Sequence, residues 1–371
     1  MRKVRDSGTP PPYLPAETSR PSPEDQIRFI ANIERILSEG SFVATYKYAL
    51  LVVLVDLAIE RGDDSNRQLA LPIHGIADKF AELYWRQAAP YEADGGSGPG
   101  LVLHQNQGKQ ASAISRLTRL RNELRGSRST LAEARRTDDW TQLVVQMRSL
   151  LKSMPLWRLQ RVGHEDIRFL YEPGPGTHYI TLLPGVACHL RERAPLIRRL
   201  AQAEWLRFVL SLKQNQPVLG HAVGLSEFLF GSNRAALSLK VSKPLRELQD
   251  GRCFYCERSL PSAAAVDHFI PWSRYPHDLA HNLVLAHGAC NSRKSDLLGG
   301  EPYLDRWAEF VSDHDADLLK LGNEAGLLVD RATSIAVAEW SYGHAERVKA
   351  EVWLGGTEYG HLSAGWRQLL R

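Results

Sequence analysis

The sequence has few cysteines and no long hydrophobic segment. Its longest uninterrupted apolar run, residues 49–55, ends at Asp56 and is too short to cross a bilayer. Residues 1–15 contain no apolar core, so no signal peptide is visible, and no internal repeat is found. Of the four cysteines, three lie in one stretch and Cys188 stands alone. These absences favour a cytoplasmic protein without a membrane segment, in a compartment that keeps thiols reduced.

Length and composition are those of an ordinary globular protein. A chain of 371 residues is long enough for two or three domains. A hydrophobic content of 43% is ample for a core. The net charge of +4 and the pI near 8.8 permit an anionic polymer as a partner but do not require one.

The clustered cysteines have the spacing of metal ligands. Cys253 and Cys256 form a C-x-x-C pair, and His287 and Cys290 form an H-x-x-C pair. Two such pairs of nitrogen and sulfur ligands are typical of a closed structural zinc site. A redox motif is the alternative for an isolated C-x-x-C, but no thioredoxin-like βαβ pattern surrounds this one. The sequence therefore predicts a structural Zn²⁺ held by these four residues.

A short ββα segment is predicted around the zinc ligands. Apolar residues that favour strands flank Asp267 and His268, and residues 283–285 have the pattern of a return strand. Residues 288–296 have the pattern of a short helix that begins beside the second ligand pair. We expect this order to place Asp267, His268 and Asn291 around one point.

These side chains suit phosphodiester hydrolysis, which needs a base for water and a cation for phosphate charge. Histidine titrates near neutral pH, so His268 suits the base. Asp267 and Asn291 offer hard oxygen ligands for a catalytic divalent metal, Mg²⁺ or Mn²⁺. Asn282 can hydrogen-bond backbone or imidazole and so hold the loop that aims His268.

The constellation resembles the HNH endonuclease family. Asp-His followed by a hydrophobic residue and proline, then Asn-Leu, then Cys-Asn-x-x-Lys, follow the family's order over about residues 251–296. The resemblance implies a general base, two metal ligands and a mainly structural asparagine, which fall on His268, on Asp267 and Asn291, and on Asn282. The chain departs from the family at Asn291, where the family name implies a histidine, and at His287, where a cysteine is more common.

Nucleic-acid contacts are predicted in two places. Lys294 lies one helical turn beyond Asn291, where it could meet a phosphate, and its neighbour Arg293 is a second candidate. An arginine-rich helix at about 109–125 carries Arg116 and Arg119, together with other arginines. Such a surface can track a phosphate backbone, and the alternative is a solvated basic face.

The remaining sequence is predominantly helical. Helices are expected at about 23–39, 42–61, 72–87, 109–125, 138–152, 195–212, 301–322 and 333–354, with strands at 167–171 and 178–183. We expect a mainly α protein with a small α+β (ββα-metal) HNH nuclease domain. The expected organisation is a disordered tail (1–21), a helical N-terminal domain (22–155), a mixed α/β connecting region (156–235), the HNH module with structural zinc (236–300) and a C-terminal helical cap (301–371).

The resemblance implies a metal-dependent endonuclease that cleaves nucleic acid, with DNA as the expected substrate. A module of this kind after a long helical region resembles nucleases of bacterial restriction and anti-phage systems. Two alternatives stay open: a mobile-element endonuclease, and a non-catalytic zinc protein that only binds nucleic acid. A partner protein, or a second copy of the chain, is a further expectation for the helical N-terminal domain.

Overall fold

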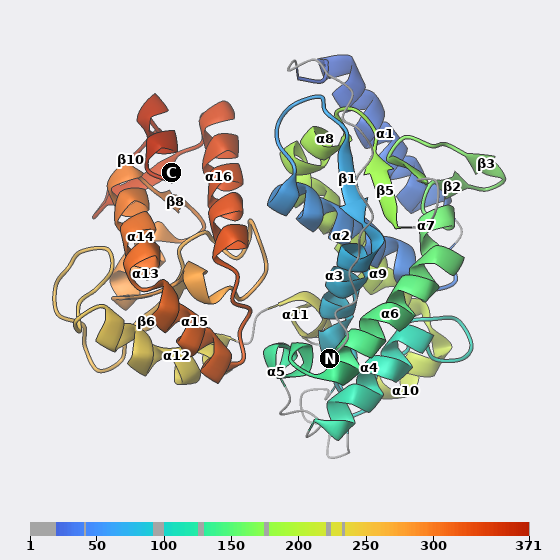
Figure 1. Cartoon of the computed structure of the whole chain (residues 1–371), viewed down its shortest axis with the longest axis horizontal. Helices are drawn as coiled ribbons and strands as arrows, with labels where there is room; N and C mark the ends of the chain where they lie inside the picture. The colour runs from blue at the N-terminus through green and yellow to red at the C-terminus, as the bar shows by residue number, and fades with distance from the viewer. Residues whose placement is uncertain are drawn as a thin grey trace. The chain divides into compact units, whose positions relative to one another are not determined.

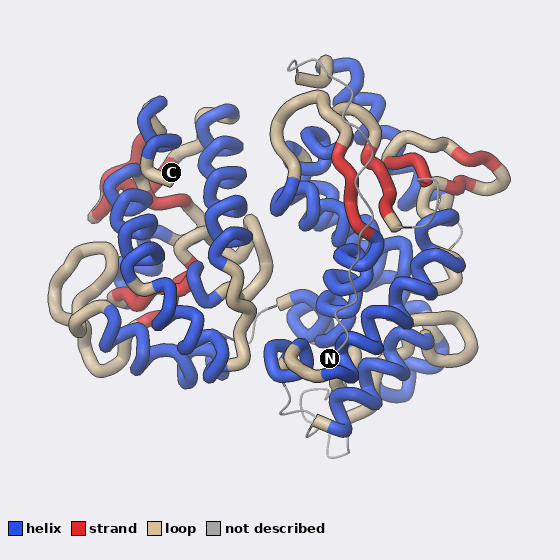
Figure 2. Tube along the Cα trace, in the orientation of Figure 1, coloured by secondary structure: helices blue, strands red, loops and turns tan. Residues whose placement is uncertain are grey.

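The computed structural model describes residues 20–40, 42–91, 100–124, 130–173, 178–219, 224–231 and 234–370. The expected tail, 1–21, lies almost wholly outside the described residues. The chain forms two compact units. Unit 1 comprises Met1–Ser127 and Asp138–Leu225, and unit 2 comprises Arg128–Thr137 and Ser226–Arg371. Helices dominate both, and the strands form small sheets among them (Figure 2). The expected fold class is confirmed.

Unit 1 is built mainly from helices. Its helices are α1 (Pro23–Glu39), α2 (Tyr46–Arg61), α3 (Ile73–Gln87), α4 (Ser112–Glu123), α6 (Asp138–Ser153), α7 (Pro155–Arg158), α8 (Val186–Glu192), α9 (Ala194–Ser211) and α10 (Gln216–Leu219), with a 3-10 turn at Lys213–Asn215. The N-terminus of α1 has the capping expected from its sequence, because the Ser22 side chain accepts from the Asp25 backbone N–H. Proline follows Ser22 at the first helical position.

The core of unit 1 surrounds α2. Nearly every residue of α2 is buried, because the apolar run that begins at Ala49 covers all sides of the helix. Helices α3, α8 and α9 pack against it. The one acidic side chain in the middle of α2, Asp56, is compensated by an ion pair with the buried Arg198 of α9.

A small antiparallel sheet lies beside these helices. It has the order β1-β5-β4, in which β1 is Leu69–Pro72, β4 is Tyr171–Pro173 and β5 is Tyr179–Leu182. Leu71 pairs with Ile180, and both side chains are buried. Figure 1 shows β1 and β5 side by side. A short ribbon of β2 (Arg161–Val162) and β3 (Glu165–Asp166) comes before β4 in the sequence.

Unit 2 contains the ββα segment. Its elements are α5 (Leu131–Arg135), α11 (Leu225–Phe230) apart from its first residue, α12 (Arg234–Leu248), β6 (Ala265–His268), a 3-10 turn at Ala280–Asn282, β7 (Leu283–Ala286), α13 (Gly288–Lys294), β8 (Leu298–Gly299), α14 (Glu301–Asp313), α15 (Asp315–Ala325), α16 (Arg331–Arg347), β9 (Val352–Gly355), β10 (Glu358–Gly360) and a 3-10 turn at Ala364–Gln368. Strands β6 and β7 pair antiparallel, so that Asp267 lies opposite Val284 and His268 opposite Leu283. Helix α12 packs on this hairpin.

The C-terminal elements differ from the expected pair of long helices. The first predicted helix, 301–322, is divided at His314 into α14 and α15. The second ends at Arg347, and residues 352–355 form β9 instead. Strand β9 pairs parallel with β8, which follows α13 directly. This pairing brings the C-terminal residues onto the same small sheet as the strand beyond the ββα helix.

The sequence predicts five ranges, whereas the chain forms two units, so several predicted ranges share one unit. Most of the predicted connecting region, up to Leu225, lies in unit 1 with the N-terminal helices. The HNH module and the C-terminal helices share unit 2. Helix α5 also belongs to unit 2, although it lies between two helices of unit 1 in the sequence.

Candidate metal centre and active site

The first pair of cysteines lies in a tight turn before the hairpin. The Glu257 backbone N–H donates to the Cys253 carbonyl at 2.9 Å, and Glu257 has a left-handed backbone with φ of 58°. The Phe254 backbone N–H donates to the carbonyl of Leu285 on β7 at 3.0 Å, which attaches the turn to the hairpin. Both aromatic residues of the turn, Phe254 and Tyr255, are buried. The turn is therefore held both by its own hydrogen bond and by the hairpin.

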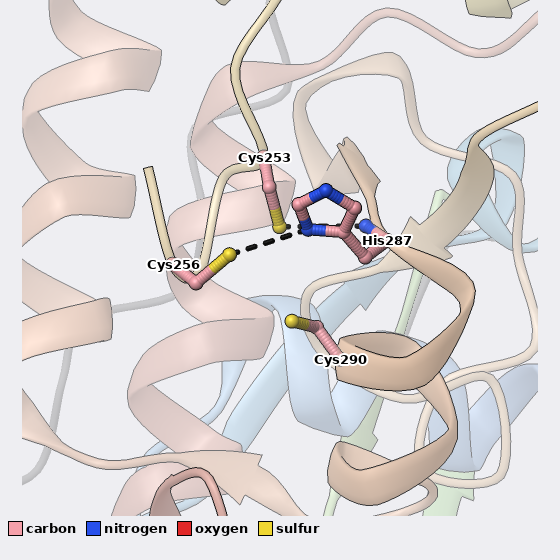
Figure 3. A group of neighbouring side chains, drawn as sticks. All are labelled: Cys253, Cys256, His287 and Cys290. Atoms are coloured by element: carbon pink, nitrogen blue, oxygen red, sulfur yellow. Dashed lines mark hydrogen bonds between the residues drawn. The ribbon is translucent and has the colours of Figure 1, made fainter. Parts of the chain in front are cut away.

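The four predicted zinc ligands lie together. The sulfur atoms of the three cysteines and a ring nitrogen of His287 all lie within 4.8 Å of one another. Ligands about 2.3 Å from a tetrahedral zinc ion lie about 3.8 Å apart, so the group is close to the size that the ion requires. Figure 3 shows Cys253 and Cys256 on one side, and His287 and Cys290 at the start of α13 on the other. The group could hold a structural metal such as zinc.

The hydrogen bonds of His287 leave Nδ1, the ring nitrogen beside the Cys256 sulfur, available to bind a metal. Its Nε2 lies 3.0 Å from the Ser259 carbonyl oxygen, which can only accept, so Nε2 carries the proton. Its Nδ1 then has a lone pair and lies 3.2 Å from the Cys256 sulfur. Metal-binding histidines commonly have their other nitrogen held in this way. Burial raises the pKa of Cys256, but hydrogen bonds with Arg258, Cys253 and His287 together outweigh it and lower that pKa to about 6. The low pKa favours the thiolate form that binds zinc.

A polar cavity of about 350 Å³ lies beside the hairpin and α13. Asp267 and His268 line it from β6, and Asn291 lines it from α13. Trp272 and Asp296 also contribute to its wall. The three side chains that the sequence predicts around one point are therefore on the wall of one cavity, together with further polar groups.

His268 is oriented by a carboxylate that was not predicted from the sequence. Its Nε2 lies 2.8 Å from Oδ1 of Asp278, in the loop between the strands. A carboxylate accepts the hydrogen bond, so Nε2 carries the proton and Nδ1 carries the lone pair. Within the described part of the chain, Nδ1 makes no hydrogen bond. A signal for Asp278 was present, because it is the single carboxylate in the sequence between His268 and Asn282.

One carboxylate oxygen of Asp267 accepts hydrogen bonds from other described residues, and the other does not. Oδ2 accepts from the Tyr255 hydroxyl at 2.5 Å and from the Lys294 ammonium at 2.9 Å. Burial and the adjacent carboxylate raise the pKa of Tyr255 well above its usual range, so the phenol keeps its proton and donates. Oδ1 makes no hydrogen bond within the described residues. Tyr255 lies between the two cysteines of the first pair, so this bond links the zinc ligands to the cavity.

Lys294 is positioned differently from the expectation. Its side chain is fully buried, and the ammonium donates to the His268 carbonyl at 3.0 Å as well as to Asp267. Burial lowers the pKa of Lys294, while the Asp267 charge opposes that shift. Lys294 therefore holds Asp267 and the end of β6, and the phosphate contact stays a prediction. The neighbouring Arg293 is exposed on α13.

Replacement of Lys294 by methionine is expected to lower the free energy of unfolding of unit 2 by about 3 kcal/mol. Methionine preserves most of the volume but leaves the Asp267 carboxylate buried without its cation. Urea unfolding followed by tryptophan fluorescence measures the change. Arg293→Met is the control, since this exposed neighbour should change stability by less than about 0.5 kcal/mol. If Lys294→Met were as stable as the unmodified chain but bound DNA more weakly, the result would support a contact between Lys294 and a phosphate.

The two asparagines have different surroundings. The amide of Asn282 is buried and bonds both backbone groups of Ile270, donating to its carbonyl at 2.9 Å and accepting from its N–H at 2.7 Å. These bonds hold the backbone at Ile270, two residues after His268. Such a contact is what a structural role of Asn282 requires. The side chain of Asn291 makes no hydrogen bond within the described residues and lines the cavity with Asp267. Asp267 Oδ1 and the Asn291 amide oxygen form an oxygen donor set that suits Mg²⁺ or Mn²⁺.

The arginine-rich helix α4 has two kinds of arginine. Arg116 and Arg119 are exposed, and Arg116 donates to the Gln146 side chain. Arg121 is buried, donates to the Trp85 carbonyl at 3.2 Å and lies over the Trp85 ring. Its role is packing within unit 1, so only the exposed arginines remain candidates for phosphate contacts.

Two family models match the chain, one mainly in each unit. Residues 253–299 match the family described as HNH endonuclease, a range that holds the four candidate metal ligands, Asp267, His268 and Asn291. The predicted resemblance is confirmed. The chain belongs to the family described as domain of unknown function (DUF8808), whose model matches residues 26–223, more than half of the sequence. No curated protein and no solved structure was found to match the chain.

The HNH match indicates nuclease activity, metal binding and nucleic-acid binding at the level of the family. In the described part of the chain, no helix has the length and apolar character to cross a membrane.

Proposed function

We propose that the protein is a metal-dependent endonuclease that hydrolyses phosphodiester bonds in DNA. The observation that carries the proposal is the shared cavity of Asp267, His268 and Asn291. A protein that only binds nucleic acid needs no imidazole oriented by a carboxylate and no uncommitted oxygen ligands beside it. The hydrogen bond from His268 to Asp278 and the available Oδ1 of Asp267 therefore favour catalysis over the non-catalytic alternative.

In the proposed reaction, Nδ1 of His268 removes a proton from water. The resulting hydroxide attacks phosphorus while the bond to the 3′-oxygen breaks. The leaving 3′-oxygen takes a proton from solvent water, which gives the 5′-phosphate and 3′-hydroxyl ends implied by the family resemblance. Asp278 stabilises the imidazolium that forms, because its carboxylate accepts from Nε2. Asp267 and Asn291 would hold a divalent ion, whose charge offsets the negative charge that develops on the phosphate and leaving oxygen.

A cleavage assay tests the activity and its substrate. Supercoiled plasmid, linear duplex, single-stranded DNA and RNA are incubated with the full chain and Mg²⁺ or Mn²⁺, with modified and unmodified DNA compared. We expect metal-dependent nicking or cutting of DNA with 5′-phosphate ends. Binding of DNA with no cleavage under any of these ions would favour the non-catalytic alternative. Preferential cleavage of RNA would correct the substrate.

The exposed arginines of α4 give a separate prediction about DNA affinity. If Arg116 and Arg119 bind phosphates, the double alanine variant should bind DNA more weakly. The slope of log affinity against log salt should become shallower by about 0.9 for each duplex phosphate that is no longer neutralised. Filter binding or fluorescence anisotropy at several salt concentrations measures the slope. Arg207→Ala, at an exposed arginine of α9, is the control. An unchanged slope would assign Arg116 and Arg119 to a solvated basic face.

We also propose a cellular location and a biological role. Three metal-ligating thiols require reduced cysteines, which supports the proposal of a cytoplasmic protein. A role in bacterial restriction or anti-phage defence remains a prediction from the family resemblance. The same holds for a partner protein or a second copy of the chain at the helical N-terminal region.

A further inference from the structure

Unit 1 contains a cavity of about 430 Å³ that the nuclease chemistry does not use. Its wall comes from the first half of α1, the loop between β3 and β4, and the first half of α8. The volume lies within the range of pockets that hold small organic ligands. The residues that line it lie within or next to the range matched by the DUF8808 family.

A buried histidine on the cavity wall lacks a hydrogen-bond partner. His189 is 5% exposed, and its buried Nδ1 has no partner within the described residues. The ring stacks on Phe29, with centroids 4.8 Å apart and planes at 26°. Burial lowers the pKa of His189, with Arg193 adding to the shift and Asp25 opposing it, so the imidazole is neutral at neutral pH. His189 therefore contributes a neutral aromatic ring to the cavity wall.

Further polar groups around the cavity are uncommitted. The side-chain amides of Asn32 and Asn66 make no hydrogen bond within the described residues. Each amide offers two donors and one acceptor oxygen. Such groups can read the edge of a heteroaromatic ring, as they do when proteins recognise bases.

The charged groups of the cavity are mainly cationic. Arg28 and Arg168 have exposed side chains, and each has one distant carboxylate neighbour, Asp25 at 3.8 Å and Asp166 at 4.0 Å. Asp25 also lines the cavity, but its carboxylate accepts from the Ser22 hydroxyl at 3.0 Å. Both guanidinium groups therefore remain available for a phosphate, which arginine binds through paired N–H donors.

Aromatic surface completes the wall. Phe169 is partly exposed in the cavity, and its ring meets Phe29 edge-on with centroids 5.6 Å apart. Phe29 itself is buried between Phe169 and His189. A planar ring that enters the cavity would contact Phe169 and the imidazole, and stacking of bases on aromatic side chains is favourable.

We propose that this cavity binds a nucleotide. Arg28 and Arg168 bind the phosphate, the amides of Asn32 and Asn66 bond the edge of the base, and the base lies against Phe169 and His189. The shared chemistry is a phosphate joined through a sugar to a heteroaromatic base, whether in a free nucleotide or at the 5′-end of a strand. The site is independent of the proposed nuclease activity, because none of its residues lies in the ββα segment.

Isothermal titration of the full chain tests the proposal with AMP, GMP, ATP, adenosine and inorganic phosphate. We expect at least one nucleotide to bind more tightly than both adenosine and phosphate, since both parts of the ligand interact with the wall. Arg28→Ala and Arg168→Ala should each weaken that binding about tenfold or more, and Asn32→Ala should weaken it and change the preference between AMP and GMP. Arg35→Ala is the control, because Arg35 lies on the same helix outside the cavity.

A parallel titration separates the two sources of the nucleotide. In a His268→Ala background, a short oligonucleotide with a 5′-phosphate is compared with the same strand without it. If the phosphorylated strand binds more tightly than the mononucleotides, and Arg28→Ala abolishes this binding, the ligand is a strand end. If a mononucleotide binds more tightly, the ligand is a free nucleotide. The proposal is overturned if no nucleotide or strand binds at about 1 mM, if phosphate alone binds as tightly, or if the arginine and control variants behave alike.

Discussion

Replacing Cys253 or Cys290 with serine is expected to unfold the ββα segment and the parts of unit 2 that pack on it. The four ligands connect the turn at residues 253–256 to the start of α13. Structural zinc contributes about 10–16 kcal/mol of apparent binding free energy in zinc-finger peptides, and this energy stabilises only the folded state. A serine hydroxyl is a much poorer zinc ligand than a thiolate, so the variants forgo most of that contribution.

Two measurements check this prediction. Elemental analysis of the purified protein should give one zinc per chain, and thermal unfolding of the serine variants should begin at a much lower temperature than in the unmodified chain. Cys188→Ala is the matched control, because Cys188 is buried in α8 of unit 1 and is not a member of the ligand group. Serine variants that melt like the unmodified chain, together with a zinc-free preparation, would rule out the four-ligand assignment.

The variant His268→Ala should cleave DNA at least about 10²-fold more slowly, with little change in folding or DNA binding. Alanine removes the base that accepts the proton from water, and general-base catalysis typically contributes roughly 10²–10⁴-fold. The metal-binding oxygens of Asp267 and Asn291 are not altered by the change. Single-turnover cleavage at matched metal concentration measures the rate, and circular dichroism checks the fold.

A second histidine of unit 2 provides the control for this variant. His361 is exposed and hydrogen-bonds the Ala350 carbonyl, and it does not line the catalytic cavity. His361→Ala should therefore cleave like the unmodified chain. If His268→Ala retained the full rate at matched metal concentration, the proposed mechanism would have to be abandoned.

The zinc ligands and the cavity residues were predictable because short spacings determine them. C-x-x-C and H-x-x-C fix which side chains can meet, and the Asp-His pair ends a strand whose partner follows closely in sequence. The remaining interactions of the site depend on three-dimensional packing. Nothing in the local pattern shows that Tyr255, in the middle of the first ligand pair, reaches Asp267, or that Lys294 turns inward to the same carboxylate.

Helix positions in unit 1 were predictable where apolar spacing and a cap coincide, as in α1. The division of the predicted helix 301–322 at His314 was not, because the residues on both sides keep the apolar spacing of a helix. The strand at 352–355 was missed for a different reason. It is the central strand of a three-stranded sheet. Its parallel partner β8 lies far earlier in the chain at Leu298–Gly299, and sequence periodicity does not report such distant pairing. Its antiparallel partner β10 follows closely, so the Gly355–Gly356 pair was a turn signal that could have indicated the hairpin.

Helix α5 has a consequence for making fragments of this protein. The chain enters unit 2 at residue 128, returns to unit 1 at residue 138 and enters unit 2 again at residue 226. Within unit 2, the Arg136 guanidinium donates to the Asn323 carbonyl at 3.1 Å, and Thr130 lies against Gly326. A fragment that starts at Ser226 would lack these interactions, and one that ends at Leu225 would carry α5 without the residues it packs on. No single cut separates two complete domains, so an isolated nuclease would need the α5 segment supplied as a fusion or a separate peptide.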